Sequence, residues 1–179
     1  MTWIDRTTGN ERPGPYETSG ILGGLYVAPR AFIEAIEGWP QLQAWYGMDE
    51  EALTLLAVAH GLKTIFHPGV AIWHLFRGHK PDQIQVPFTM DGPMCHARAW
   101  CAMYRLVFDE AHWATWRKML ATTIDGRAAI PEEIIRTVET PEFTRYRDRI
   151  QGRFKLTSDE IIAEVGRRMA RDEKKREAA

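Results

Sequence analysis

The sequence predicts an α/β protein in which short strands and helices alternate over residues 21–80 and a mainly α-helical region occupies residues 81–179. Two observations support this prediction. Runs rich in β-forming residues and bounded by Gly and Pro occur at 21–28 and in two pieces over 63–76, which His67-Pro68-Gly69 separates. Beyond residue 95, apolar side chains recur at three- and four-residue spacing, the period of helices packed on a core.

The length and charge of the chain limit the classes of protein to which it can belong. Its 179 residues suffice for one domain with a hydrophobic core. Residues 1–20 are polar and rich in Gly and Pro, so we expect an arm that lies on another part of the protein. Lys and Arg number 23 against 24 Asp and Glu, a net charge of −1. This balance argues against nucleic acid or an anionic membrane surface as the partner.

The cysteines and the apolar runs indicate in which cellular compartment the protein is expected. Cys95 and Cys101 are six residues apart in a predicted helix, which places them on different faces and outside disulfide geometry. No apolar run reaches the roughly 18 residues of a membrane-spanning helix, and the N-terminus lacks the layout of a signal peptide. We therefore expect free, buried thiols, no membrane span and a cytoplasmic protein.

Pro, Gly and capping residues predict the helix boundaries over residues 21–80. Pro29 fits the first turn of a helix that runs to about Ile36 and ends at Gly38. Asp49 is a candidate N-cap for the next helix, and Gly61 stands where a C′ glycine is expected.

Over residues 81–179, the sequence predicts a loop that ends at Pro93, a helix over 96–107 and a second helix from Asp109. Thr140-Pro141 begins another helix, and Thr157 and Glu160 form a capping box in front of the last one. The side chains expected to pack against the core are Trp100, Trp113, Trp116, Leu120, Ile161, Val165 and Met169. The charged last ten residues are expected to fray.

Four features follow one another over residues 20–80. They are Gly23-Gly24 in a predicted strand, Gly38-Trp39, the acids Asp49-Glu50 behind Trp45-Tyr46-Gly47, and His74-Leu75-Phe76-Arg77 at the end of a predicted strand. The set resembles the C-terminal half of a GT-A glycosyltransferase domain, as found in β-1,4-galactosyltransferases, polypeptide N-acetylgalactosaminyltransferases and bacterial family-2 enzymes. In these families an acidic turn opens a helix that closes at a Gly twelve residues later, as Asp49 and Gly61 do here.

The resemblance implies a partial GT-A, Rossmann-like half-domain over residues 21–80 and a glycosyltransferase of the hexosyltransferase type. Asp49 and Glu50 are then the candidate catalytic residues, because an acceptor hydroxyl needs a carboxylate to take its proton. His74 is the candidate ligand of Mn²⁺ or Mg²⁺, which neutralises a departing diphosphate. The implied substrate-binding residues are Gly23, Gly24, Trp39, Trp45, Tyr46, Gly47 and Arg77. The implied donor is a nucleotide-diphosphate sugar, a UDP-sugar first, and the implied acceptor is a carbohydrate or a glycosylated molecule.

The chain also departs from the family pattern. It contains no Asp-x-Asp motif, which ends the nucleotide-binding first half in these families, and only 22 residues precede Gly23. The acidic pair has the order Asp-Glu where the families usually have Glu-Asp, and Leu56 stands where an Arg is often found. We therefore expect a split or truncated domain whose donor half is missing or lies on another polypeptide. Because a half-sheet exposes a strand edge, we also expect a partner subunit or a homo-oligomer.

The same residues allow a second hypothesis, a non-catalytic glycan- or protein-binding module, or a decayed remnant, that keeps the half-fold without a donor site. Asp49 then acts only as an N-cap, and His74 is a hydrogen-bonded strand residue. A zinc site of His67, His74 and His79 is not expected, because spacings of seven and five residues lack the short paired spacing of zinc motifs.

Overall fold

The structure, a computed structural model, describes residues 14–20, 26–42, 48–67, 92–120, 122 and 129–177, with the side chains of 92–94 and 175–177 excepted. Its elements in chain order are β1 (Tyr16–Thr18), α2 (Arg30–Ala35), α3 (Asp49–Ala59), β2 (Thr64–Phe66), α4 (Gly92–Val107), α5 (Glu110–Leu120), α6 (Glu132–Arg136), α7 (Pro141–Gln151) and α8 (Ser158–Glu177). The described part of the chain is thus mixed α/β and mostly helical.

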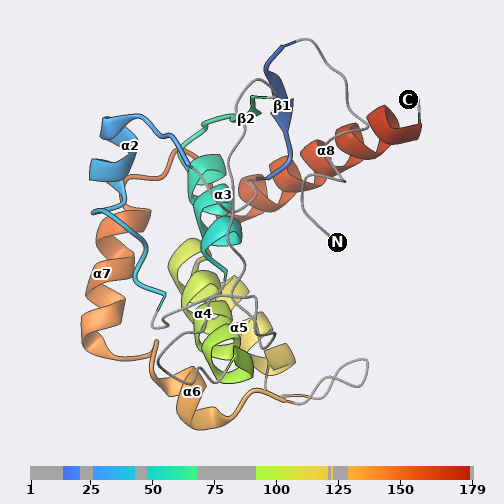
Figure 1. Cartoon of the computed structure of the whole chain (residues 1–179). Coiled ribbons are helices and arrows are strands. Elements are labelled where there is room, and N and C mark those ends of the chain that lie inside the picture. Colours follow the sequence, from blue (N-terminus) through green and yellow to red (C-terminus); the bar gives the residue numbers. More distant parts are fainter. Residues whose placement is uncertain are drawn as a thin grey trace, which may run out of the picture.

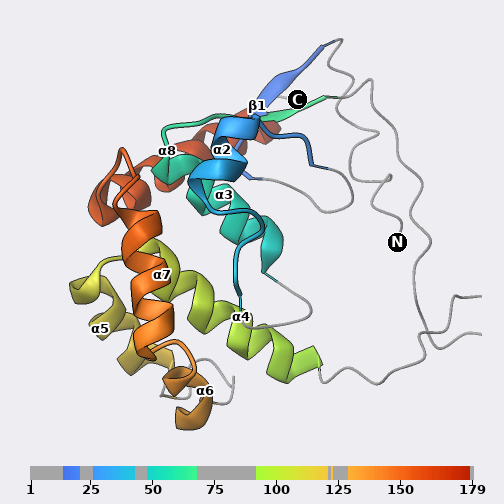
Figure 2. The ribbon, with the colours of Figure 1, turned by 90° about the vertical axis from the view of Figure 1, so that its left-hand side faces the viewer.

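Helices α3 and α4 lie at the centre of the molecule (Figure 1 and, after a quarter turn, Figure 2). Helix α3 contacts α4 and α8, and α4 also contacts α5, α6 and α7. The buried apolar side chains form one cluster that reaches from Phe32 on α2 to Ile161 on α8. Residues on both sides of the interval 68–91 therefore share a single core.

The described strands form a two-stranded antiparallel sheet in which Tyr16 pairs with Phe66 and Thr18 with Thr64. The hydroxyl of Thr64 donates to the carbonyl of Thr18 across the sheet, at 2.6 Å. Strand β1 belongs to the segment predicted as an arm, and its polar residues become a strand because β2 supplies the backbone partners. This sheet does not fit a GT-A fold, so the GT-A half-domain is not found in the described part of the chain.

The described end of the arm, residues 14–20, lies on helix α8 as well as on β2. The carboxylate of Glu17 pairs with Arg171 at 2.8 Å and with Lys63 at 3.4 Å. The backbone amide of Ser19 donates to the carboxylate of Asp172, at 2.6 Å. Contacts between residues more than 150 positions apart thus hold residues 14–20 against α8.

Helix α3 ends in the arrangement that the sequence predicts at Gly61. Gly61 has φ +69° and donates its N–H to Val58, while Leu62 donates to Ala57, both at 2.8 Å. This pair of bonds is a Schellman motif, in which glycine takes the left-handed position without steric strain. Helix α3 therefore ends sharply, and the chain turns into β2.

One predicted helix boundary is wrong by one residue. The N-cap of α3 is Met48, with φ 64° and no capping side chain, so Asp49 is the first helical residue. Helix α2 ends as predicted: Ile36 is its C-cap, and Glu37 and Gly38 follow with φ 59° and φ 93°, with Gly38 donating to the carbonyl of Ile33. The carboxylate of Glu37 also pairs with Arg149 and Arg153.

The later helices begin at the predicted caps. Asp109 accepts from the amide of His112 and Thr140 from that of Phe143, at 3.1 and 3.2 Å. The capping box is formed, since the Thr157 amide donates to Glu160 at 2.8 Å and the Glu160 amide donates back to the Thr157 hydroxyl at 3.4 Å.

Other predictions about the secondary structure are corrected. Helix α4 begins at Gly92 instead of residue 96, and α6 was not predicted. Residues 26–28 of the predicted strand at 21–28 are irregular, while the second β-rich piece, after Gly69, lies outside the described residues. Helix α8 continues to Glu177 instead of fraying over the last ten residues. Met169 is 54% exposed, and Arg168 takes the buried position beside it, because its guanidinium bonds to Glu164 and to the carbonyl of Leu62.

The predicted cysteine and tryptophan positions agree with the structure, except that Cys95 is only partly buried. Cys95 and Cys101 are both free thiols, and burial, followed by the nearby charge of Glu139, raises the pKa of Cys101 to about 12. Trp113 is buried and Trp116 packs edge-on against Phe108, with ring centroids 4.2 Å apart. These side chains belong to the helical core.

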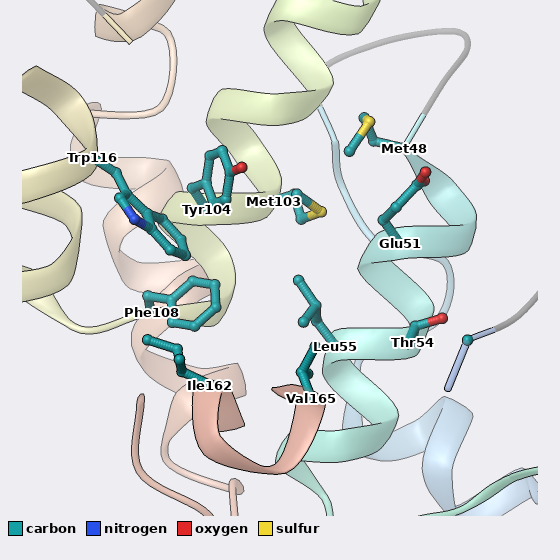
Figure 3. A pocket seen from close by; sticks show the side chains of 11 residues that line it. Met48, Glu51, Thr54, Leu55, Met103, Tyr104, Phe108, Trp116, Ile162 and Val165 are labelled. Atoms are coloured by element: carbon teal, nitrogen blue, oxygen red, sulfur yellow. The ribbon is translucent and has the colours of Figure 1, made fainter. Parts of the chain in front are cut away.

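An apolar pocket of about 430 Å³ opens between α3, α4, α5 and α8 (Figure 3). Aromatic side chains of Tyr104, Phe108 and Trp116 form one side, and Leu55 and Thr54 of α3 form the other. The pocket lies next to the first turn of α3, because Met48 and Glu51 also line it.

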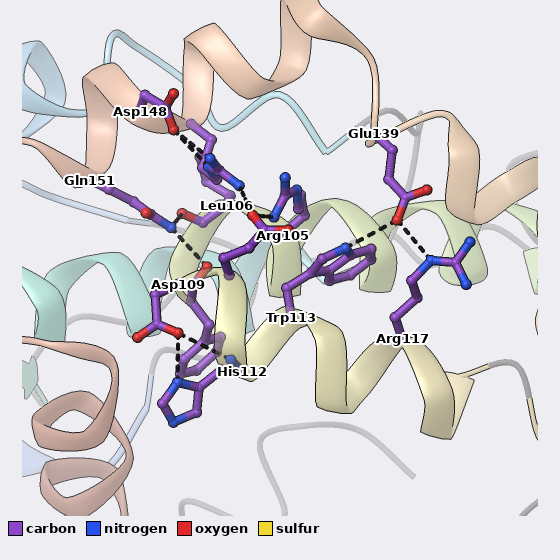
Figure 4. A network of polar contacts seen from close by, with 12 residues as sticks. Arg105, Leu106, Asp109, His112, Trp113, Arg117, Glu139, Asp148 and Gln151 are labelled. Atoms are coloured by element: carbon purple, nitrogen blue, oxygen red, sulfur yellow. Dashed lines mark hydrogen bonds and ion pairs between the residues drawn. The ribbon is translucent and has the colours of Figure 1, made fainter.

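Charged and polar side chains connect α4, α5 and α7 at the edge of the core (Figure 4). Arg105, whose side chain is only 7% exposed, pairs with Glu110 at 2.6 Å, and Arg147 of α7 pairs with the same carboxylate at 2.9 Å. The amide of Gln151 donates to the carbonyls of Leu106 and Phe108. These contacts satisfy the last carbonyls of α4 and fix the turn into α5.

We expect Gly61→Ala to lower the free energy of unfolding by about 1–2 kcal/mol, because alanine is strained in the left-handed conformation. Gly166→Ala is the matched control: Gly166 is an exposed position inside α8 with no atom within 4 Å of an added Cβ. This control is expected to gain about 0.5–1 kcal/mol. Urea denaturation of both variants measures the difference, and an equal effect at the two positions would contradict the assignment of the C′ position.

A second prediction concerns His112, which lies 2.9 Å from Asp109 and 3.2 Å from Asp159. The hydrogen bond to Asp109 is the main reason why the pKa of His112 is raised, and the pKa of Asp109 is lowered to about 2. The charged pair therefore stabilises the fold fully below the ordinary histidine pKa of about 6.5 and loses this effect as the pH rises through the folded pKa. We expect His112→Ala to lower the melting temperature more at pH 5.5 than at pH 9; an equal loss at both values would show that His112 acts only by packing.

Candidate functional site

The first turn of α3 carries both predicted catalytic residues. Asp49, Glu50 and Glu51 occupy its first three positions, behind the left-handed Met48. Free backbone N–H groups at a helix N-terminus favour negative charge, so three carboxylates can be held close together there. The core holds the rest of the helix and thereby fixes the position of this turn, since seven of the eight residues from Ala52 to Ala59 are buried.

Tyr26, in the segment before α2, contacts this turn, and Trp39, in the segment after α2, contacts Tyr26. The hydroxyl of Tyr26 is in hydrogen-bonding contact with the carboxylate of Glu50. The ring of Trp39 packs against the ring of Tyr26, with centroids 5.9 Å apart, and is itself 55% exposed. The structure therefore brings together Trp39, Tyr26 and Glu50, which are separated by up to 24 positions in the sequence.

Burial and the negative charges of the turn raise the pKa of both Glu50 and Tyr26. Partial burial, followed by the neighbouring charges of Asp49 and Glu51, raises the pKa of Glu50. Burial also raises the pKa of Tyr26, and the charges of Glu50 and Asp49 add to the effect. Tyr26 is therefore a hydrogen-bond donor at neutral pH, and Glu50 is a stronger base than an exposed glutamate.

This arrangement can bind a hydroxylated ligand and take a proton from it. An exposed indole ring offers a flat apolar surface, which suits the face of a sugar ring. A carboxylate with a raised pKa beside that surface can act as a general base toward a hydroxyl placed there. The geometry is compatible with both binding alone and binding with proton transfer.

Sequence reasoning found part of this group. Asp49, Glu50 and Trp39 were predicted as site residues, and Trp39 and Glu50 are linked through Tyr26, which was not predicted. Its signal was weak, because a tyrosine in a β-rich run is most simply explained as a packing residue. The other predicted site residues, Gly23, Gly24, Trp45, Tyr46, Gly47, His74 and Arg77, lie outside the described residues.

The described residues do not supply a metal site by themselves. Among them, no group of three or more His, Cys, Asp or Glu side chains could hold a metal ion. The predicted metal ligand, His74, lies outside the described ranges.

Comparisons with known proteins add no family to this picture: no family model matches the chain, and neither a similar curated protein nor a similar solved structure was found. Within the described ranges, the structure also holds no helix of the length and apolarity needed to cross a membrane.

We expect Glu50→Gln to raise the melting temperature at pH 7. Folding raises the pKa of Glu50, so the ionised carboxylate destabilises the native state, and this penalty grows as the pH rises from the ordinary value of 4.5 through the folded pKa. Glutamine keeps an acceptor for Tyr26 without the charge. The difference between variant and wild type should shrink toward pH 4, where Glu50 is protonated.

The matched control is Glu133→Gln, which removes an exposed acid from the first turn of α6. It reports the loss of the favourable interaction between a carboxylate and a helix N-terminus. Thermal unfolding, monitored by circular dichroism from pH 4 to pH 8, gives the melting temperatures of both variants. A Glu50→Gln variant that is less stable than Glu133→Gln at pH 7 would show that Glu50 carries no such penalty.

Proposed function

We propose that this chain supplies the acceptor side of a glycosyltransferase that uses a nucleotide-diphosphate sugar, with a UDP-sugar as the first choice. The observation that carries the proposal is the contact of Glu50 with Tyr26 beside the exposed ring of Trp39. Asp49, Glu50 and Trp39 belong to the ordered residue set that resembles GT-A enzymes. The proposal rests on these residues and their geometry, since the described elements do not form a GT-A fold.

In this proposal Glu50 is the general base, and Asp49 is its neighbour on the turn. The acceptor hydroxyl loses its proton to the Glu50 carboxylate while its oxygen attacks the anomeric carbon of the donor. The bond between the sugar and the diphosphate breaks, and the nucleoside diphosphate leaves with the electron pair. The Tyr26 hydroxyl orients the carboxylate by donating to it, and Trp39 supports one face of the acceptor sugar.

The donor side of the reaction is proposed to come from residues outside the described part or from another polypeptide. His74 and Arg77 remain the proposed ligands of a divalent cation and of a phosphate, and Mn²⁺ or Mg²⁺ is the proposed cofactor. A partner subunit or a second copy of the chain would then complete the site.

The second candidate function is a non-catalytic module that binds glycans or proteins. The observation that favours it is the apolar pocket next to the acidic turn, since an apolar pocket with a few polar groups is typical of binding sites in general. This module would use Trp39, Tyr26 and the pocket for recognition, and Glu50 would remain a polar contact without a chemical role.

Release of UDP tests the proposal. The purified full-length chain is incubated with Mn²⁺, a mixture of simple saccharides and UDP-glucose, UDP-galactose or UDP-N-acetylglucosamine in turn. We expect UDP release with at least one donor and a decrease of about 100-fold or more in Glu50→Gln, which is the usual contribution of a general base. Glu133→Gln on α6 serves as the control and should release UDP at the wild-type rate.

Calorimetry with UDP separates the two candidate functions. Binding that requires Mn²⁺ and is lost in His74→Ala would support a donor site that includes this chain. Equal rates of UDP release by Glu50→Gln and wild type would contradict the role of Glu50. No UDP release and no UDP binding, together with saccharide binding that depends on Trp39, would favour the binding module.

A further inference from the structure

We propose that His60 is a pH-sensitive contact of the fold: when its imidazole binds a proton, helix α2 and the connecting segment between α7 and α8, residues 152–157, separate from the C-terminal end of α3. His60 is the C-cap residue of α3 and is only 7% exposed. The inference concerns a conformational change and does not depend on the proposed transfer reaction.

The ring of His60 lies where three parts of the chain meet. It packs edge-on against Phe32 of α2 and against Phe154 of the connecting segment, with ring planes at 83° and 81°. Its Nε2 atom is buried and has no hydrogen-bond partner within the described part of the chain. Protonation therefore puts a charged N–H group into apolar surroundings without an acceptor, and burial of an unpaired charge is costly.

Burial and two positive charges oppose the protonation of His60. Burial is the largest cause of its lowered pKa, followed by the charges of Lys155 and Arg153. Both cations belong to the connecting segment, whose six residues include no acid. A charged imidazole is therefore repelled by the segment that packs against it.

The acids on the α2 side already have other partners. Glu34 pairs with Arg30 at 2.7 Å, and Glu37 pairs with Arg149 and Arg153. Helix α3 itself carries no charged side chain beyond its first turn. The two elements that contact the imidazole thus offer no unpaired carboxylate to a protonated ring.

The connecting segment joins α2 to α3 on both sides of this ring. Arg153 donates to two carbonyls in the last turn of α2, the closer one at 2.8 Å. The amides of Lys155 and Leu156 donate to the carbonyl of Ala59, at 2.8 and 3.2 Å. Because the ring that contacts His60 lies between these two groups of bonds in the chain, repulsion at His60 acts on both of them.

The direction of the pH effect follows from the lowered pKa. In the open state His60 is exposed and regains the ordinary histidine pKa of about 6.5, so opening takes up a proton below this value. The contact is complete above about pH 6.5 and weakens as the pH falls toward the folded pKa. An increase in acidity therefore favours the open state.

Opening also reaches the candidate site, because α2 lies between Tyr26 and Trp39 in the chain. Their rings pack at a centroid distance of 5.9 Å. Separation of α2 from α3 changes the position of both residues relative to α3, which carries Glu50. The amide of Gly38, which donates to the carbonyl of Ile33 at 2.8 Å, reports on this end of α2.

Hydrogen exchange of the full-length chain at pH 5 and pH 7.5, corrected for the intrinsic exchange rate at each pH, tests the proposal. We expect the opening constants of the Gly38, Lys155 and Leu156 amides to rise about threefold to 30-fold at pH 5, the range set by a histidine that regains a pKa of about 6.5 when it is exposed. Amides inside α4 should keep their protection. An equal increase in α4 would indicate global unfolding and would overturn the proposal.

Three variants identify the group that binds the proton. His60→Phe keeps an aromatic ring that cannot be protonated, so the opening constants should no longer depend on pH. Lys155→Gln removes a repelling charge and keeps the backbone N–H, so the pH dependence should become smaller. Lys118→Gln, at an exposed lysine of α5, is the matched control and should behave as the wild type.

NMR titration of the His60 imidazole keeps the proposal testable even where His60→Phe does not fold. We expect a midpoint below pH 6.5 in the wild type and a higher midpoint in Lys155→Gln. A wild-type midpoint at or above pH 6.5 would contradict the proposal, as would a pH dependence of opening that persists in folded His60→Phe. Because no step uses UDP or a saccharide, these outcomes are independent of the transfer assay.

Discussion

Burial of helix α3 is the constraint on which the rest of the structure depends. A helix that is buried on most of its surface needs partners for its terminal carbonyls as well as for its side chains. The carbonyl of Ala59 accepts from the amides of Lys155 and Leu156, and the carbonyl of Leu62 accepts from Arg168. The segment between α7 and α8, and helix α8 itself, therefore supply the hydrogen-bond donors for carbonyls at the C-terminal end of α3 and just beyond it.

The same burial explains the contacts of His60. Its imidazole packs between the rings of Phe32 and Phe154, at centroid distances of 5.6 and 5.5 Å, and burial lowers its pKa. A neutral imidazole suits this place, because the positive charges of Lys155 and Arg153 lie nearby. Helix α2 and the segment between α7 and α8 are thus connected to the C-terminal end of α3 by aromatic packing.

The two ends of α3 have different roles in this account. The C-terminal end is held by segments from distant parts of the chain, and the N-terminal turn presents three carboxylates to Tyr26 and to the pocket. Because the buried length of the helix is rigid, the carboxylates of that turn have fixed positions relative to α4 and α8. Fixed positions are what both a general base and a shape-selective binding pocket require.

The sequence alone determined the local features of this protein. Helix starts at Asp109, Thr140 and Thr157, and the helix end at Gly61, could be predicted because capping depends on neighbouring residues. The free cysteines and the buried tryptophan of α5 followed from helical spacing. Asp49, Glu50 and Trp39 were chosen as site residues through a resemblance, and the structure links Trp39 with Glu50 through Tyr26.

Only the tertiary structure decided what depends on distant partners. Tyr16–Thr18 form a strand because Thr64–Phe66 lie beside them, and the carboxylate of Glu37 finds its partners on Arg149 and Arg153, more than 110 positions away. The contact between Tyr26 and Glu50, and the pocket between α3 and α8, join residues that no local pattern connects. The physical reason is that burial, pKa and cavity shape are set by neighbours in space, which the order of residues in the chain does not specify.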